Sequence, residues 1–193
     1  MHSAFFVWAI DMSTRFVGAL AVVLLPMAWR PAAADPVQIV AVGASNTWGW
    51  GVGGQSAFPA RLEALLRARG LEAYVINAGV VAATTAGMLH RIDSSAIDGT
   101  HLVILQPGGN DLRFFGTREQ RAANIAAIER RLRERGIKLI VYDPVFPPEY
   151  FSFDRIHFTT AAHAQIAAEL VPLVTAALQK TKLRKPLEGA KSR

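Results

Sequence analysis

The chain has 193 residues, 51% of them apolar, a length that supports one hydrophobic core better than two. It contains no cysteine, which excludes disulfides, thiolate metal sites and a cysteine nucleophile. The formal net charge is +6, but residues 35–179 carry thirteen basic and thirteen acidic side chains, whereas residues 180–193 carry six basic and one acidic. We therefore expect one nearly neutral folded domain, a basic C-terminal tail and no nucleic-acid partner.

The basic tail over residues 180–193 has two interpretations. A frayed, solvated chain end is the simpler one, because terminal segments are commonly unpacked. Weak contact with an anionic membrane surface through its lysines and arginines is the alternative.

The first 34 residues are typical of an export signal. A short cationic start follows Met12, an apolar run covers residues 16–29, and Ala32–Ala34 offer a small-residue cleavage site. We expect cleavage before Asp35 and hence a periplasmic or secreted protein, with Met12 as an alternative start of translation. The apolar run is shorter than the ~20 residues that span a bilayer, which disfavours the alternative of a permanent membrane anchor.

Beyond the signal, short apolar runs alternate with amphipathic stretches. The predicted strands are Val37–Gly43, Ala73–Ala78, Leu102–Gln106 and Lys138–Asp143. The predicted helices run from Phe58 to Gly70, from a capping box at Thr117 to Gly136, and from Thr159 or Thr160 to about Gln179. Since each parallel crossover needs a helix, this order predicts a single α/β domain with three layers, in which helices cover both faces of a parallel sheet.

Ligands bind such sheets at the carboxyl ends of the strands, so the residues that follow the strands are the candidate site. Three blocks follow predicted strands, and a fourth precedes the last helix. They are Gly43–Thr47, Asn77–Gly79 with Ala82–Thr84, Gly108–Asp111, and Asp154–His157.

Together these blocks resemble the SGNH subgroup of the GDSL hydrolases, and within it the small periplasmic acyl-CoA thioesterase, lysophospholipase and arylesterase type. The resemblance extends from Val37 to about Leu173. It implies a flavodoxin-like fold and hydrolysis of acyl esters or thioesters through an acyl-enzyme. It also implies a small acyl ester or thioester as the partner and neither a metal nor an organic cofactor. We expect a monomer.

The resemblance assigns a role to each block. Ser45 maps onto the family's nucleophile, His157 onto the general base and Asp154 onto the acid that orients the base. The implied oxyanion donors are the backbone N–H groups of Ser45 and Ala82 and the side-chain amide of Asn110. The chemistry requires these residue types, because a serine hydroxyl reacts only when a base takes its proton and the developing oxyanion needs donors fixed in advance.

Four further residues are candidates for lining the substrate pocket: Asn46, Trp48, Trp50 and Gly109. For the two tryptophans, packing in the core and lining an acyl site remain equally open interpretations. Asp111 is expected to structure the turn after the third strand.

The chain departs from the family pattern in three places. Ala44 replaces the aspartate of the GDS block, which weakens the support of that turn, and Asn46 is a candidate substitute for the lost hydrogen bonds. Ala82 replaces a glycine but keeps the backbone N–H. Asp154 follows Asp143 almost at once, so the helix and fifth strand that relatives carry there are missing and the sheet should have four strands. The shortened fold leaves a second interpretation open, an inactive protein that binds lipid or glycan on the same scaffold.

Two rival motifs fit the sequence less well. Gly49–Gly54 matches the dinucleotide pattern GxGxxG, with Glu72 about twenty residues on, but these glycines neither follow the strand directly nor open the helix. The sequence also contains no Gly-Lys-Ser/Thr, which a P-loop would require.

His90, His101 and His163 lack the spacing of metal ligands, and we expect them to be solvated or to lie on helix faces.

Overall fold

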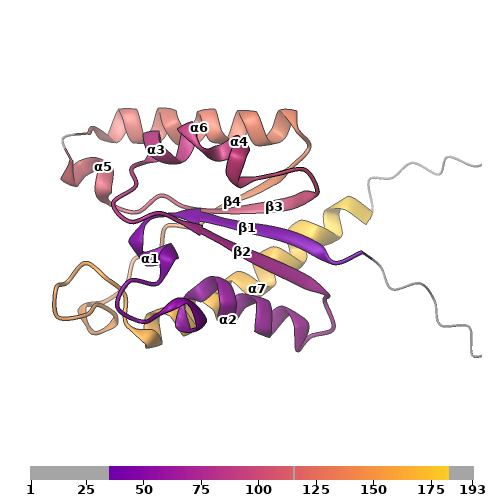
Figure 1. The fold of residues 1–193 in the computed structure, drawn as a ribbon, viewed down its shortest axis with the longest axis horizontal. Coiled ribbons are helices and arrows are strands. Elements are labelled where there is room, and N and C mark those ends of the chain that lie inside the picture. The colour runs from indigo at the N-terminus through magenta and orange to yellow at the C-terminus, as the bar shows by residue number, and fades with distance from the viewer. Residues whose placement is uncertain (1–34, 115, 183–193) are drawn as a thin grey trace, which may run out of the picture. The chain divides into compact units, whose positions relative to one another are not determined.

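The computed structural model describes residues 35–114 and 116–182 of the chain (Figure 1). The predicted signal, residues 1–34, and residues 183–193 of the basic tail lie outside the described residues. Export, and contact of the tail with a membrane surface, therefore remain predictions.

A parallel four-stranded sheet in the order β2-β1-β3-β4 forms the centre of the domain. Its strands are β1 (Val37–Gly43), β2 (Ala73–Gly79), β3 (Thr100–Gln106) and β4 (Lys138–Val141). β3 begins earlier than predicted because Thr100 pairs with Gln38 beyond a register shift. β4 ends earlier than predicted because its ladder with β3 stops at the pair Leu105–Val141.

The strand order is that of a flavodoxin-like sheet without its fifth strand, as the short connection before Asp154 predicted. The segment between β4 and the last helix contains no further strand of the sheet among the described residues. It holds a single 3-10 turn, η2 (Pro148–Tyr150), and one isolated antiparallel bridge between Phe151 and Phe158.

Helices cover both faces of the sheet (Figure 1). One layer holds α2 (Phe58–Arg67) and α7 (Thr160–Lys182), and the other holds α3 (Thr85–His90), α4 (Ile92–Ser95) and α6 (Arg118–Glu134). The capping box at the start of α6 is present as predicted. The bounds of α3 and α4 were not predicted, since helices this short show too few periodic positions.

Three shorter elements lie near the carboxyl ends of the strands. The turn α1 (Ser45–Trp48) directly follows β1, and the turn α5 (Asn110–Arg113) begins soon after β3. A 3-10 turn, η1 (Gly54–Ser56), leads into α2.

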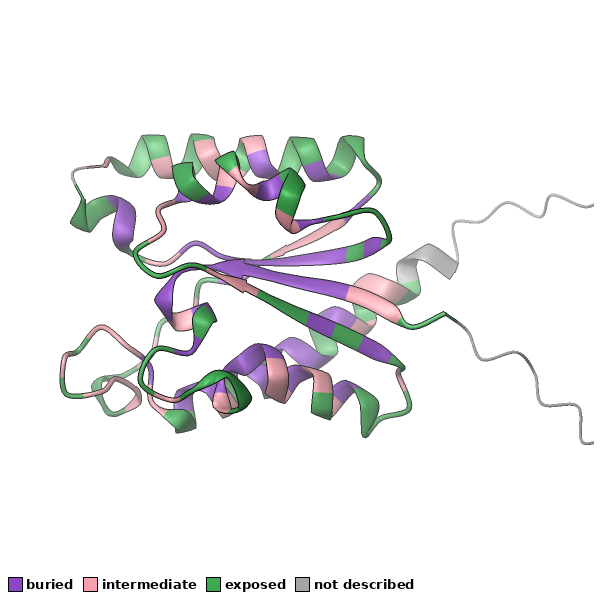
Figure 2. Ribbon diagram, viewed as in Figure 1, coloured by how far each residue is buried: buried purple, intermediate pink, exposed green. Residues whose placement is uncertain are grey.

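Two hydrophobic cores fill the spaces between the sheet and the helices (Figure 2). Successive side chains of an interior strand point to opposite faces, so β1 contributes to both cores. Ile39 packs in the same core as Leu62 of α2, whereas Val40 packs with Met88 of α3 and Ile128 of α6. This burial on both faces explains why β1 is a nearly continuous apolar run.

Helix α7 is long and apolar enough over Thr160–Gln179 to cross a membrane by composition alone. In the domain its buried residues belong to the core shared with α2 and the sheet: Ala162, Ile166, Ala167, Leu170, Val171 and Val174. Core packing therefore accounts for the apolar character of this helix.

Candidate active site

The candidate site lies at the carboxyl ends of β1 and β3, where sequence reasoning placed it. β1 leads to Ser45, the first residue of α1, and β3 leads to Asn110, the first residue of α5. The connections from β1 and β3 diverge to opposite sides of the sheet, and ligands of open α/β sheets bind at such a switch point.

Ser45, His157 and Asp154 form a continuous hydrogen-bonded chain. The hydroxyl oxygen Oγ of Ser45 lies 3.0 Å from Nε2 of His157. On the other side of the ring, Nδ1 of His157 lies 2.6 Å from Oδ2 of Asp154. The separation of Ser45 and His157 is within the reach required for proton transfer between a nucleophile and a base. The three predicted residues are thus brought together despite the short fold.

The carboxylate of Asp154 is held as an anion by several donors. The backbone N–H of His157 donates to Oδ1 at 3.0 Å, and the backbone N–H of Ile156 and the hydroxyl of Ser152 donate to the same oxygen at 2.9 and 2.8 Å. These bonds, led by the one from the His157 backbone, lower the pKa of Asp154 far below its usual range. A carboxylate that stays ionised can hold the imidazole with its proton on Nδ1.

The side chain of Asn46 ties the serine turn to the histidine segment. Its Nδ2 donates to the carbonyl of Ile156 at 3.2 Å, and its Oδ1 accepts from the backbone N–H of Phe158 at 2.9 Å. Asn46 thus bonds to both neighbours of His157. These contacts fit the substitute role that the sequence suggested for Asn46 in the presence of Ala44.

The turn that carries Ser45 also packs tightly against the end of β1. The hydroxyl of Thr47 donates to Oε1 of Gln106 at 2.7 Å, and both residues are buried. A Cβ atom on Gly43 would lie 1.9 Å from the Thr47 hydroxyl oxygen. Only glycine at the end of β1 therefore lets α1 fold back this closely.

The three candidate oxyanion donors lie on separate segments. The side-chain amide of Asn110 donates to the carbonyl of Ala83 at 3.0 Å, which fixes the amide plane. No hydrogen bond to another described residue uses the backbone N–H of Ser45 or of Ala82. Ala82 adopts φ 61°, a left-handed conformation that glycine would adopt without strain.

Asp111 has a structural environment, in agreement with its predicted role in the turn. Its carboxylate accepts from the backbone N–H of Thr85 at 3.0 Å and from the Thr85 hydroxyl at 2.5 Å. The amide of Asn124 donates to the same hydroxyl at 3.0 Å. This buried network connects α5, α3 and α6 behind Asn110.

The two tryptophans are partly exposed and lie outside the hydrophobic cores. Trp48 and Trp50 are 49% and 45% exposed, so they are not core residues, and they do not line the cavity described below. Trp50 instead stacks on the ring of His157 with ring centroids 5.5 Å apart. Trp48 lies beside Trp50, with ring centroids 6.0 Å apart, and the assignment of the two tryptophans to the substrate pocket stays a prediction.

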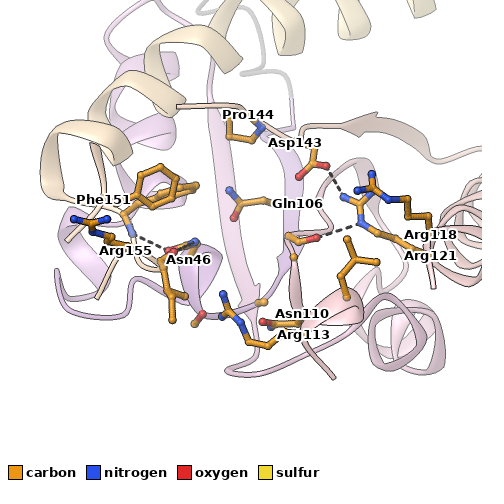
Figure 3. A pocket seen from close by; sticks show the side chains of 17 residues that line it. Asn46, Gln106, Asn110, Arg113, Arg118, Arg121, Asp143, Pro144, Phe151 and Arg155 are labelled. Atoms are coloured by element: carbon orange, nitrogen blue, oxygen red, sulfur yellow. Dashed lines mark hydrogen bonds and ion pairs between the residues drawn. The ribbon is translucent and has the colours of Figure 1, made fainter. Parts of the chain in front are cut away.

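A cavity of about 470 Å³ opens beside Ser45 (Figure 3). The pocket candidates Asn46 and Gly109 line it, together with Ser45 and Asn110. Its further walls were not anticipated from the sequence: Gln106, Leu112, Arg113, Arg118, Arg121, Asp143, Pro144, Phe151, Arg155, Ile156 and Phe158. The sequence does not predict this cluster of arginines, because basic and acidic residues balance over residues 35–179.

The other histidines in the described part of the chain lie apart from this chemistry. His90 is exposed, and Nδ1 of His101 accepts from the backbone N–H of Gln38 at 3.2 Å. His163 lies on the buried face of α7, where Nδ1 accepts from the backbone N–H of Phe58 at 3.2 Å. Within the described residues, no group of three or more histidine, aspartate or glutamate side chains could hold a metal ion.

Comparison with known proteins identifies relatives over most of the chain. A family model described as the GDSL-like lipase/acylhydrolase family matches residues 41–189. The esterase TesA of Pseudomonas aeruginosa is 30% identical over 161 residues, which cover 80% of this chain and 77% of that protein.

Solved structures share the fold. The crystal structure of TesA superposes with a TM-score of 0.66 at 21% identity, over 72% of this chain and 99% of that one. The psychrotrophic esterase EstA from Pseudoalteromonas sp. gives a TM-score of 0.64 at 16% identity, over 74% and 98% of the two chains. AlinE4, an esterase of the SGNH-hydrolase family, gives a TM-score of 0.54 at 25% identity, over 84% and 87%.

Proposed function

The chain belongs to the GDSL-like lipase/acylhydrolase family of ester-hydrolysing enzymes, and from this premise we propose that it cleaves acyl esters and thioesters through an acyl-enzyme on Ser45. The observation that carries the proposal is the 3.0 Å separation between Ser45 Oγ and His157 Nε2. An inactive binding module on this scaffold would have no need to keep these two atoms within hydrogen-bond distance.

In the proposed reaction, Nε2 of His157 takes the proton of the Ser45 hydroxyl while Oγ attacks the acyl carbonyl carbon. Asp154 keeps the other proton of the imidazole on Nδ1 and stabilises the imidazolium that forms. The tetrahedral intermediate collapses when His157 gives its proton to the leaving alcohol or thiol. Water, deprotonated by the same histidine, then attacks the acyl-enzyme and releases the acid and free Ser45.

The negative charge that develops on the carbonyl oxygen needs donors already in place. The proposed donors are the Asn110 amide and the backbone N–H groups of Ser45 and Ala82. The bond from Asn110 to the Ala83 carbonyl supports this role, because it orients the amide before substrate arrives and leaves its second N–H free to donate.

A panel of p-nitrophenyl esters of graded acyl length, with a thioester alongside, tests the proposal. The wild-type protein should hydrolyse at least one ester, and Ser45→Ala and His157→Ala should each reduce kcat by a factor of about 10⁴ or more while circular dichroism stays unchanged. His90→Ala is the matched control, because His90 is exposed and should leave kcat unchanged. Full activity of folded His157→Ala would refute the proposed triad.

We further propose that the enzyme acts outside the cytoplasm, in the periplasm or after secretion. The cationic start, apolar run and Ala-Ala-Ala sequence before Asp35 support this location. Mass spectrometry of the protein recovered from its native host should find an N-terminus at Asp35. An intact N-terminus at Met1 or Met12 in the membrane fraction would contradict cleavage and favour an anchor.

A further inference from the structure

The cavity beside Ser45 has a strongly basic wall. Four arginines from three segments line it: Arg113 on α5, Arg118 and Arg121 on α6, and Arg155 on the loop before His157 (Figure 3). Asp143 is the single acidic residue of the lining. Residues 35–179 carry thirteen charges of each sign, so this excess of positive charge is local to the cavity.

Only one of the four arginines is neutralised within the described part of the chain. Arg121 pairs with Asp143 and also donates from Nε to the carbonyl of Gly108 at 3.2 Å. The guanidinium groups of Arg113, Arg118 and Arg155 have neither an ion pair nor a hydrogen bond to any described residue. Three cations therefore face the cavity with their donors available.

Two of these arginines occupy backbone positions that are unfavourable for arginine. Arg118 is the first residue of α6, where the helix dipole is positive and disfavours a cation. Arg155 adopts φ 56°, a conformation that is strained for residues other than glycine. Arg118 is attracted electrostatically to its exposed neighbour Glu119, and an anionic ligand in the cavity would give a further partner to Arg118 and a partner to Arg155.

The rest of the wall is suited to a short carbon skeleton. Leu112, Phe151 and Phe158 contribute apolar surface to the same cavity. A molecule that places an ester carbonyl at Ser45 would then extend an apolar portion and a terminal charge along the same cavity.

We propose that this cavity recognises an anionic oxyacid group of the substrate, a carboxylate or a phosphate, through Arg113, Arg118 and Arg155. The inference rests on the proposed esterase function and narrows its substrates to esters that carry such a group. The group can belong to the acyl portion, as in the half-ester of a dicarboxylic acid, or to the alcohol portion, as in an alcohol that bears a phosphate.

Two matched pairs of esters separate these sources. The acyl pair is mono-p-nitrophenyl glutarate and its neutral methyl ester, and the alcohol pair is p-acetoxyphenyl phosphate and p-methoxyphenyl acetate. At low ionic strength, kcat/KM for the anionic member of one pair should exceed that of its neutral partner by about tenfold or more, the effect of a charge-assisted hydrogen bond. The preference should shrink as salt is added. A preference within the acyl pair would place the anionic group on the acyl portion of the substrate, and a preference within the alcohol pair would place it on the alcohol portion.

A triple variant, Arg113→Gln with Arg118→Gln and Arg155→Gln, should lose the preference, because its kcat/KM for the anionic ester should fall to that for the neutral partner. The matched control removes three charges outside the lining: Arg69→Gln, Arg130→Gln and Arg133→Gln. The control variant should keep the preference for the anionic ester, because the effect is local to the cavity. Loss of the preference in the control variant would show that net charge alone attracts the anion and would contradict the inference.

The remaining outcomes separate this inference from the proposed function. Hydrolysis of the neutral esters without a preference for either anion would overturn the inference and leave the esterase function standing. Persistence of the preference in the triple cavity variant would also overturn it. Failure of the wild-type protein to hydrolyse any ester would refute the esterase function and the inference together.

Discussion

Asn46 follows Ser45 in the chain, and its Oδ1 accepts a hydrogen bond from the backbone N–H of Phe158, the residue that follows His157, at 2.9 Å. A second bond, from Asn46 Nδ2 to the carbonyl of Ile156, lies on the other side of His157 in the sequence. The proposed nucleophile and base are therefore aligned by neighbours that bond to each other directly. This arrangement holds the two segments in register without the aspartate that the family places at Ala44.

Asn46→Ala should lower both stability and turnover. It leaves the backbone N–H of the buried residue Phe158 without its partner, which costs about 1–3 kcal/mol in the free energy of unfolding. Urea denaturation measures the stability, and kinetics on one activated ester measure kcat. Asn46→Asp, which keeps the acceptor for Phe158 but loses the donor to Ile156, should fall between wild type and Asn46→Ala. Wild-type kcat in Asn46→Ala would show that the alignment does not depend on this side chain.

Asn110→Ala should reduce kcat by roughly 10²–10³ and leave KM nearly unchanged, because an oxyanion donor acts on charge present only in the transition state. Asn124→Ala is the control, since Asn124 supports the same region through Thr85 without reaching the proposed oxyanion site. It should lower the melting temperature and leave kcat within a few-fold of wild type. A rise in KM at constant kcat for Asn110→Ala would contradict the oxyanion role.

Ala82→Gly should leave the enzyme as stable as wild type or stabilise it by up to about 1 kcal/mol. Glycine relieves the strain of the left-handed conformation at φ 61°, and this gain offsets the larger conformational entropy that glycine loses on folding. Ala82→Val should destabilise the protein by more than about 1 kcal/mol, since a branched side chain fits this conformation poorly. Ala86→Gly, within α3, is the reference and should cost about 0.5–1 kcal/mol. Equal losses at positions 82 and 86 would argue against strain at Ala82.

The stability of the domain should fall between pH 6.5 and about pH 4 because of His163. Burial, and to a lesser degree Arg61, lower its pKa from 6.5 to about 4. Over this range the unfolded chain binds the proton more readily than the folded one, so the stability present above pH 6.5 decreases on acidification, by roughly 3 kcal/mol in total.

Denaturant titrations at several pH values, with wild type and His163→Gln side by side, measure this dependence. The variant should lack the loss between pH 6.5 and 4, whatever its stability at neutral pH. Exposed His90 supplies the control, as His90→Gln should retain the wild-type slope. An unchanged slope in His163→Gln would assign the acid sensitivity to other groups.

The sheet and the residues aligned in it could be predicted because local patterns determine them. Apolar runs marked β1 to β4, and the short segment before Asp154 predicted the absence of a fifth strand. Ser45 and Asn110 were predicted to be neighbours because parallel strands present their carboxyl ends at one edge, and the place of His157 beside them was implied by the family resemblance.

The cavity and its charge could not be predicted, since they depend on how distant segments pack. Arg113, Arg118 and Arg155 lie on three separate segments, and each alone is an ordinary surface arginine in the sequence. The stacking of Trp50 on His157 likewise joins segments that are far apart in the chain, so residue types alone do not reveal it.

Ser45 and His157 are separated by 112 positions in the chain, yet their side chains must meet within 3.0 Å. Closing so long a loop is entropically costly, and the contact requires both the assembled sheet and the docked segment before α7. Ester turnover would therefore report on the completed topology, whereas circular dichroism responds to helices that form locally. In a refolding experiment, recovery of catalysis would therefore report the formation of this long-range contact, and the enzyme provides its own probe of it.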